Sequence, residues 1–208
     1  MQLRRGRQRG DTLIEVLFAF SILSLIIIGS LSIMNQGTIA AQRALETTFV
    51  RQQIDSQAAT LRFLHDAYVA KFQPNIAYDP ATPAGQWYNM TRNLSATSAS
   101  NFVGAATCPS VPSGSFILDG VNAKYIAGTT TTIVPASAIA EVKYTGSPEA
   151  LSQSQGIWIE AVPSPISLDV NKKNVRYIDF HIMACWQNPG QGLPMTIGTI
   201  VRLYEPRS

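Results

Sequence analysis

The chain has few charged residues, only two cysteines and a long stretch without proline. Charged residues make up 14% of its 208 residues, well below the roughly 25% of an ordinary globular protein, while apolar residues reach 46%. This balance argues against a disordered chain and directs attention to a membrane segment. The length leaves room for one domain of ordinary size and an appendage, which excludes a large multidomain enzyme.

The formal net charge of +3 arises in the first ten residues. Arg4, Arg5, Arg7 and Arg9 lie there, and removing these four from the 16 Lys and Arg leaves 12 against 13 Asp and Glu, a balance of −1. The basic character therefore belongs to a short tail, and the rest of the chain has no excess of positive charge. We expect no direct binding to nucleic acid.

An uncharged run follows the tail. Leu17–Met34 has no charged residue, and the apolar segment that contains it, Leu13–Met34, is 22 residues long. At about 1.5 Å per residue, a helix of this length crosses a hydrocarbon core of about 30 Å. The arginines before the segment predict a cytoplasmic N-terminus and an outward-facing remainder. No small-residue cleavage site follows Met34, in contrast to an ordinary secretory signal.

One acidic residue, Glu15, lies near the start of the apolar segment. A carboxylate costs roughly 2.5–3.5 kcal/mol at the centre of a membrane helix and less near the interface. No Lys, Arg or His lies between Asp11 and Gln42 to compensate this charge. One explanation is an interfacial glutamate that the helix dipole favours. The other is a partner supplied by a chain terminus or by another molecule.

The order of basic leader, Gly10, Thr12–Glu15 and apolar run resembles the class III signal of type IV pilins and type II secretion pseudopilins. The resemblance covers about the first 35 residues strongly and the remainder only in architecture. It implies that prepilin peptidase cuts after Gly10 and methylates the new N-terminus at Asp11. It also implies that Glu15 pairs with the terminal amine of a neighbouring subunit during assembly. The usual first mature residue of the family is phenylalanine, and this chain has Asp11 instead.

The resemblance implies a structural subunit of a type IV pilus or a type II secretion-like filament, and not an enzyme. Its partners would be other pilin subunits, prepilin peptidase and the inner-membrane assembly platform. The subunit would be a single-pass protein of the cytoplasmic membrane before it enters a periplasmic or cell-surface filament. A body of about 135 residues after the helix favours a minor subunit. The alternative is a signal-anchored surface domain with a binding or hydrolytic role that never polymerises.

No proline occurs before Pro74, so a helix can continue from the apolar segment to residue 73. Apolar residues at three- to four-residue spacing predict an amphipathic half over residues 35–73. The positions are Ile39, Leu45, Phe49, Val50, Ile54, Ala58, Leu61, Leu64, Tyr68 and Phe72. Gly29, Ser30 and Gly37 are its weak points, where the helix is free to bend or melt.

Residues 74–208 are predicted to form an extracytoplasmic head of loop and β-sheet. Residues 74–112 hold five prolines and a Ser/Thr/Ala-rich stretch, which predict a long surface loop with one short helix. The apolar pattern then changes to a period of two, which is typical of strands. The predicted strands are Phe116–Leu118, Ala123–Ile126, Thr131–Val134, Ile139–Thr145, Gly156–Val162, Val175–Trp186 and Met195–Tyr204.

The last two strands are predicted to form an antiparallel hairpin with a turn at Asn188–Gly192. Alternation over Arg176–Trp186 places apolar side chains on one face of a single sheet, and the amphipathic half of the helix is its natural cover. The predicted fold class is therefore α+β. A long N-terminal helix, with a transmembrane half at residues 11–34, packs on a C-terminal antiparallel sheet in a pilin-like arrangement.

Two cysteines, Cys108 and Cys185, lie in the part of the chain that is expected outside the membrane. Oxidation is permitted there, so the sequence favours a disulfide over two unpaired thiols. Metal binding by these cysteines is not expected, because neither lies in a close pair.

No catalytic residue and no cofactor is predicted, because the chain has no nucleophile elbow, metalloprotease motif or phosphate loop. We expect structural roles for both histidines, His65 and His181, and packing for the aromatic pair Trp87 and Tyr88 in the predicted loop.

A charged segment before the last two strands is interpreted as a solvated turn, and less readily as a calcium or phosphate site. Its residues are Asp169, Asn171, Lys172, Lys173 and Arg176.

Overall fold

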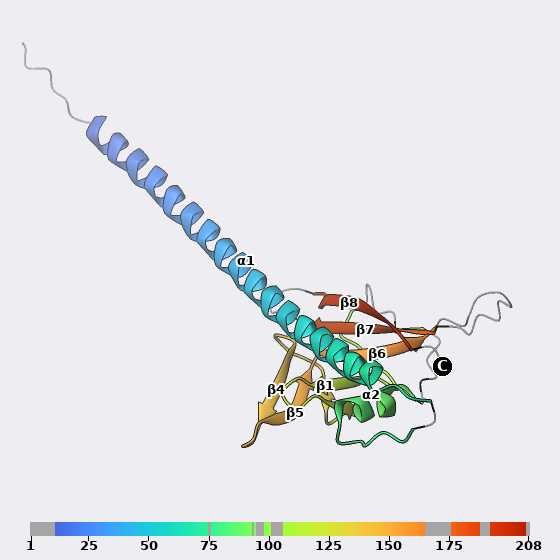
Figure 1. Cartoon of the computed structure of the whole chain (residues 1–208). Coiled ribbons are helices and arrows are strands. Elements are labelled where there is room, and N and C mark those ends of the chain that lie inside the picture. The colour runs from blue at the N-terminus through green and yellow to red at the C-terminus, as the bar shows by residue number, and fades with distance from the viewer. Residues whose placement is uncertain are drawn as a thin grey trace, which may run out of the picture. The chain divides into compact units, whose positions relative to one another are not determined.

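The computed structural model describes residues 11–74, 76–92, 94, 98–100, 106–164, 176–187 and 192–206 (Figure 1). The chain divides into two compact units, Met1–Glu46 and Thr47–Ser208. The described part of the first unit is helical throughout. The second unit combines helices with β-sheets, so the predicted α+β class is confirmed.

The described residues form the following elements. The helices are α1 (Asp11–Ala70) and α2 (Pro83–Thr91). The strands are β1 (Phe116–Asp119), β2 (Lys124–Ala127), β3 (Ile133–Val134), β4 (Glu141–Thr145), β5 (Ala150–Gln155), β6 (Ile157–Pro163), β7 (Tyr177–Trp186) and β8 (Met195–Tyr204). The short helix predicted within residues 74–112 is therefore present as α2.

Helix α1 runs through Gly29, Ser30 and Gly37 without interruption. It ends at Ala70, before the predicted limit at residue 73. Two hydrogen bonds of three-residue spacing close this end, from Lys71 N to the Tyr68 carbonyl at 3.1 Å and from Phe72 N to the Val69 carbonyl at 3.3 Å. Tightening of the last turn therefore ends the helix before Pro74 is reached.

In the second unit, α1 buries a single stripe of apolar side chains. Its members are Val50, Ile54, Ala58, Leu61 and Leu64. Spacings of three and four residues place them on one helix face, as predicted. The predicted stripe was too long at its N-terminal end, because the side chains of Leu45 and Phe49 remain 58% and 52% exposed.

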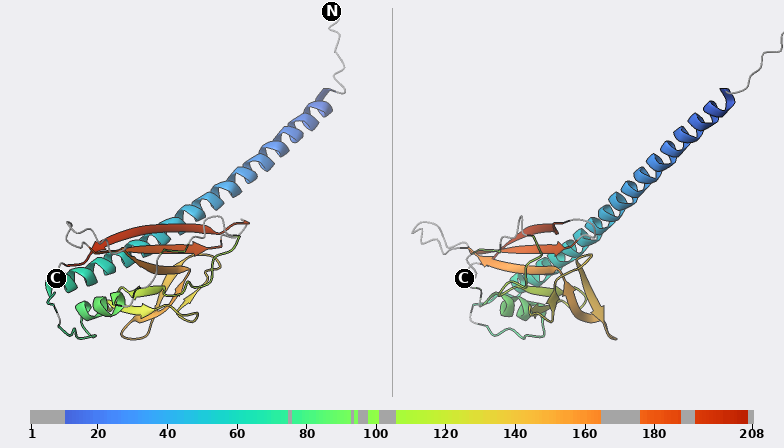
Figure 2. Two further views of the ribbon diagram at one scale, coloured as in Figure 1. Left: turned by 90° about the vertical axis from the view of Figure 1, so that its right-hand side faces the viewer. Right: turned by 180° about the vertical axis from the view of Figure 1, so that it is seen from behind.

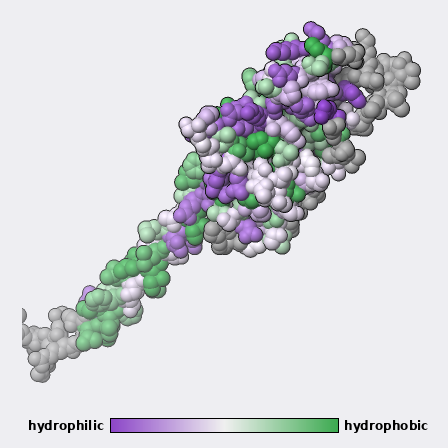
Figure 3. Space-filling model, turned by 90° about the horizontal axis from the view of Figure 1, so that it is seen from below, coloured by the Kyte–Doolittle hydropathy of each residue, from purple (hydrophilic) through white to green (hydrophobic). Residues whose placement is uncertain are grey.

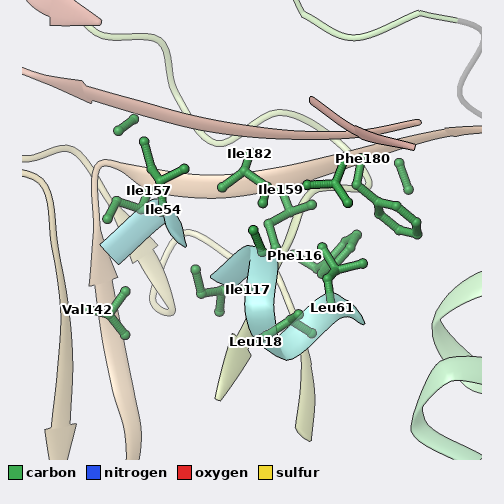
Figure 4. Packing of buried hydrophobic residues seen from close by; sticks show 14 of the residues in the cluster. Ile54, Leu61, Phe116, Ile117, Leu118, Val142, Ile157, Ile159, Phe180 and Ile182 are labelled. Atoms are coloured by element: carbon green, nitrogen blue, oxygen red, sulfur yellow. The ribbon is translucent and has the colours of Figure 1, made fainter. Parts of the chain in front are cut away.

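The buried stripe of α1 contributes to the core of the second unit. Figure 4 shows Ile54 and Leu61 of α1 gathered with apolar side chains from β1, β6 and β7. From β7, the side chains of Phe180 and Ile182 are fully buried in this cluster. The predicted cover of a sheet by the second half of the helix is therefore present.

The strands form two sheets, where the sequence predicted one. The larger sheet is antiparallel and has the order β2-β1-β6-β7-β8, and its last strands lie side by side in Figures 1 and 2. The smaller sheet has the order β3-β5-β4, with β3 parallel to β5 and β4 antiparallel to it. Strand β5 was missed because its sequence, Ala-Leu-Ser-Gln-Ser-Gln, has almost no apolar alternation.

Gly156 joins the two sheets, because it separates β5 from β6. Its φ of +62° lies in the left-handed region, which favours glycine. A side-chain Cβ at this position would overlap the carbonyl oxygen of Cys185. The predicted strand beginning at Gly156 therefore begins one residue later, at Ile157.

The predicted C-terminal hairpin is confirmed by the register of β7 and β8. Tyr177 pairs with Tyr204 at one end and Trp186 with Met195 at the other. Most of the predicted turn, residues 188–191, lies outside the described residues. Alternate residues of β7 are buried as expected, and they are Ile178, Phe180, Ile182, Ala184 and Trp186.

Candidate functional site

The N-terminal part of α1 exposes a continuous surface of large apolar side chains. Between Leu13 and Met34, fifteen of them have exposed fractions of 50–73%. Figure 3 shows apolar side chains along this part of the helix, in green. At about 1.5 kcal/mol for each side chain, leaving this surface in water costs roughly 20 kcal/mol. Burial of this surface in lipid or against other protein would recover this free energy.

Helix α1 has the length and composition needed to cross a membrane. None of its apolar window is buried within the protein, which distinguishes it from the core helix of a globular domain. The helix is thus a candidate membrane anchor near the N-terminus of the chain.

Two hydroxyl groups within the apolar segment are satisfied by the helix itself. Ser21 Oγ donates to the carbonyl of Leu17 at 2.8 Å, and Ser24 Oγ donates to the carbonyl of Phe20 at 2.7 Å. Bonds to a carbonyl four residues earlier allow a hydroxyl to lie in hydrocarbon without an unpaired donor. These serines add no unsatisfied polar group to the exposed apolar surface.

Glu15 differs from these serines because its polar group is a carboxylate. It lies four residues after the first residue of α1, and it is exposed. The nearest basic residue that follows it in the sequence is Arg43, more than seven helical turns away. The predicted cleavage residue Gly10 and the side chain of Asp11 lie outside the described residues, so processing and methylation remain predictions.

In the second unit, Cys108 and Cys185 form a disulfide, which confirms the bond that the sequence favoured. Cys185 is fully buried in β7 and shares an apolar cluster with Ile133 and Trp158. Its side chain lies on the face of β7 opposite Phe180, which belongs to the core cluster with α1. The bond therefore ties the loop before β1 to the sheet face that α1 does not cover.

Glu160 of β6 holds another part of this loop. One carboxylate oxygen accepts hydrogen bonds from the backbone N–H and the hydroxyl of Ser100, both at 2.8 Å. The other accepts from Trp158 Nε1 at 2.9 Å. Glu160 is only 7% exposed, and three donors compensate its burial. The carboxylate of Glu160 therefore has a structural role, because it fixes Ser100 against strand β6.

His65 and Trp87 take part in the packing of α1. Nε2 of His65 donates to the carbonyl of Tyr204 at 2.9 Å, and the rings of His65 and Trp87 are in T-shaped contact with centroids 5.0 Å apart. Trp87 is fully buried against Phe180, while Tyr88 is 38% exposed. The other histidine, His181, lies half-buried on β7.

The predicted solvated turn is only partly visible, because Asp169, Asn171, Lys172 and Lys173 lie outside the described residues. Among the residues that the structure describes, no group of three His, Cys, Asp or Glu side chains is placed to hold a metal ion.

A cavity of about 460 Å³ in the second unit was missed by the sequence analysis. Its lining comes from the ends of α1, α2, β6, β7 and β8, five elements that no local motif connects. The single local signal was the pair of tyrosine-bearing helix ends at Tyr68 and Tyr88, which a sequence pattern cannot distinguish from ordinary packing.

Comparison with known proteins gives no relative for this chain. No protein-family model matches it, and neither curated proteins nor solved structures include a significant match.

Proposed function

We propose that this chain is a prepilin-like structural subunit, a minor pilin or pseudopilin of a type IV pilus or type II secretion-like filament. In this proposal, prepilin peptidase cuts after Gly10, and the mature subunit waits in the cytoplasmic membrane. The inner-membrane assembly platform then moves it into a filament in which apolar helices pack side by side. The head, residues 74–208, remains on the outer side of the membrane.

The observation that carries this proposal is the uncovered apolar surface of α1. Lipid covers such a surface before assembly, and the helices of neighbouring subunits cover it afterwards. Helix α1 continues without interruption through Gly29 and Gly37, which supports packing of neighbouring helices along the whole apolar segment. A helix that continues into a stripe buried in an α+β head, with Ile54 and Leu61 in its core, supports a pilin-like arrangement.

Glu15 supports assembly over simple anchoring. In a permanent anchor, a carboxylate near the start of the apolar run gains only the modest interaction with the helix dipole, and the described residues offer it no basic partner on the same helix before Arg43. An amine created at Asp11 by cleavage is one turn away, and the same amine on a neighbouring subunit is within reach of Glu15 when helices pack with an axial offset.

The mass of the N-terminus tests the proposal. The chain is expressed in cells that carry prepilin peptidase, extracted from membranes and analysed by mass spectrometry. We expect loss of residues 1–10 and the mass of one added methyl group at Asp11. An intact leader in such cells would contradict the proposal and favour the signal-anchored surface domain. The variant Gly10→Val is the matched control, because a β-branched residue before the cut should leave the leader in place.

A further inference from the structure

The cavity of about 460 Å³ lies where the C-terminal ends of both helices meet the ends of three strands of the larger sheet. Four aromatic residues contribute to its wall, namely Tyr68, Phe72, Tyr88 and Tyr177. The rings of Tyr68 and Phe72 contact each other edge to face, with centroids 5.7 Å apart. The volume lies within the range of about 300–1,000 Å³ that is typical of small-molecule sites.

The cavity also carries charge. Arg92 follows the last residue of α2, Arg176 precedes β7, and Glu205 follows β8. Both arginines are exposed, and neither guanidinium has a hydrogen-bond or ion-pair partner among the residues that the structure describes. Among the described lining residues, two cationic side chains and one carboxylate give a net positive side-chain charge. The lining therefore favours a ligand that has one negative group.

The phenol of Tyr68 lies at this wall, where it is hydrogen-bonded to Tyr78. Burial raises its pKa to about 12, and the neighbouring Tyr78, Glu205 and Tyr88 add to the shift. The group thus stays protonated throughout the physiological pH range. Hydroxyl groups of Thr91 and Ser164 line the same space.

We propose that this cavity binds a sugar ring that carries a carboxylate, an acidic saccharide of the uronic acid class. The aromatic rings offer flat apolar faces to the C–H groups of a sugar ring. The phenols of Tyr88 and Tyr177 and the carboxylate of Glu205 match sugar hydroxyls as donors and acceptor. The guanidinium groups of Arg92 and Arg176 match the carboxylate, which arginine binds through two parallel hydrogen bonds.

The surrounding helices disfavour a phosphorylated ligand. Both α1 and α2 present their C-terminal ends to the cavity, and these ends carry partial negative charge. Phosphate groups bind preferentially at helix N-terminal ends, where backbone N–H groups point outward. A singly charged carboxylate held by arginine side chains suffers less from this field than a phosphate with nearly two charges.

This inference does not rest on filament assembly, because every lining residue lies in the second unit. The test uses the full-length chain in detergent micelles and three probes: galacturonic acid, its methyl ester and galactose. Titrations followed by saturation-transfer NMR should show galacturonic acid binding about tenfold or more tightly than the uncharged probes. Equal affinity for the three probes, or no saturable binding of galacturonic acid, would overturn the proposal.

Variants connect the binding to this cavity. Arg92→Gln and Arg176→Gln should each weaken galacturonic acid binding about tenfold, while Arg51→Gln on an exposed part of α1 should leave it unchanged. All three residues are exposed, so the fold should persist, and circular dichroism checks this. Unchanged binding by both cavity variants would overturn the site. Tighter binding of N-acetyltyrosine, a carboxylate on an aromatic residue, would overturn the saccharide assignment in favour of a peptide ligand.

Discussion

The side-chain amide of Gln57 makes two hydrogen bonds to the backbone of Leu118, as a neighbouring β-strand would. Nε2 of Gln57 donates to the Leu118 carbonyl at 2.8 Å, and Oε1 accepts from the Leu118 N–H at 2.9 Å. Strand β1 pairs with β6 only at Phe116 and Ile159, so this amide satisfies backbone groups of β1 that β6 does not reach. Helix α1 is therefore joined to the larger sheet by hydrogen bonds as well as by apolar contacts.

Gln57→Leu should lower the free energy of unfolding by about 2–4 kcal/mol, because it leaves a buried N–H and a buried carbonyl without partners. Urea unfolding of the detergent-solubilised chain, followed by near-ultraviolet circular dichroism, measures the change. Gln52→Leu, an exposed position on α1, is the matched control and should shift the free energy by less than about 0.5 kcal/mol. Equal losses of unfolding free energy in the two variants would show that the hydrogen bonds of the Gln57 amide do not stabilise the fold.

Asp119 at the end of β1 predicts sensitivity to acid. Its oxygens accept hydrogen bonds from the backbone N–H groups of Val121, Asn122 and Leu151 at 2.9–3.0 Å, and from the Asn122 amide at 3.0 Å. Burial raises the pKa of this carboxyl, but the hydrogen bonds outweigh burial and hold the pKa below its usual value. The bond to Leu151 also joins β1 to β5, and so links the two sheets.

A lowered pKa in the folded state means that Asp119 stabilises the fold at pH values above its unfolded pKa of about 3.9. This stability is lost as the pH falls through the folded pKa. Asp119→Asn should therefore cost about 1–3 kcal/mol at pH 7, and the difference from the wild type should shrink below about pH 4. Urea midpoints at several pH values test this, with the exposed Asp55→Asn as control. A difference that is independent of pH would contradict the role of the charge.

The disulfide between Cys108 and Cys185 should stabilise the second unit. The two residues are separated by 77 positions, and closing a loop of this length contributes about 4 kcal/mol on the chain-entropy estimate. We expect Cys108→Ala to lower the free energy of unfolding by about 2–5 kcal/mol. The double variant with Cys185→Ala should cost little more than the single one, because both remove the same bond. Quantitative thiol labelling of the unfolded, unreduced wild type would contradict the bond.

Gly156 should not tolerate a side chain. Gly156→Ala combines a strained positive φ with a collision against the backbone of Cys185, so we expect a loss of about 1–3 kcal/mol or more. Gly192→Ala is a suitable control, because no atom lies within 4 Å of an added Cβ there. Thermal unfolding of the two variants side by side distinguishes them, and similar midpoints would contradict the argument.

The sequence was a good guide wherever one periodicity ran over many residues. It predicted α1, the buried alternation of β7 and the hairpin with β8, because burial on one face imposes a regular pattern. It failed where a residue's role depends on a distant partner. Gln57 is a polar residue of the kind that usually faces solvent on a helix. Only its hydrogen bonds to Leu118, 61 positions away, show that it is a buried structural residue. The polar strand β5 has no pattern of its own, since its neighbours in the smaller sheet define it.

The same limit applies to the two candidate sites. The apolar surface of α1 and the position of Glu15 are local properties, and the sequence alone identified them. The cavity near Arg92 and Arg176 depends on residues that are more than eighty positions apart in the chain. Trp87 illustrates the difficulty, because its neighbour Tyr88 lines the cavity while Trp87 itself is part of the core.

Glu15 places a carboxylate near the start of an apolar helix, where solvation of the charge is costly. If Glu15 pairs with an amine at Asp11 of a neighbouring subunit, Glu15→Ala should leave cleavage and membrane insertion intact and reduce incorporation into filaments. The carboxylate is costly in hydrocarbon, so its removal should if anything favour insertion. Immunoblots of sheared filaments and of membranes, normalised to each other, measure the distribution.

Ser21→Ala provides the control, because it removes another polar group of the same segment whose hydroxyl is already satisfied by the Leu17 carbonyl. We expect this variant to assemble at the wild-type level. Asp11 carries a carboxylate of its own beside the new amine. Asp11→Phe, which restores the usual first residue of the pilin family, should therefore strengthen the attraction between subunits and raise incorporation. Wild-type incorporation of Glu15→Ala would instead identify this residue as an interfacial glutamate at a helix start, held by the helix dipole, and would remove its role in assembly.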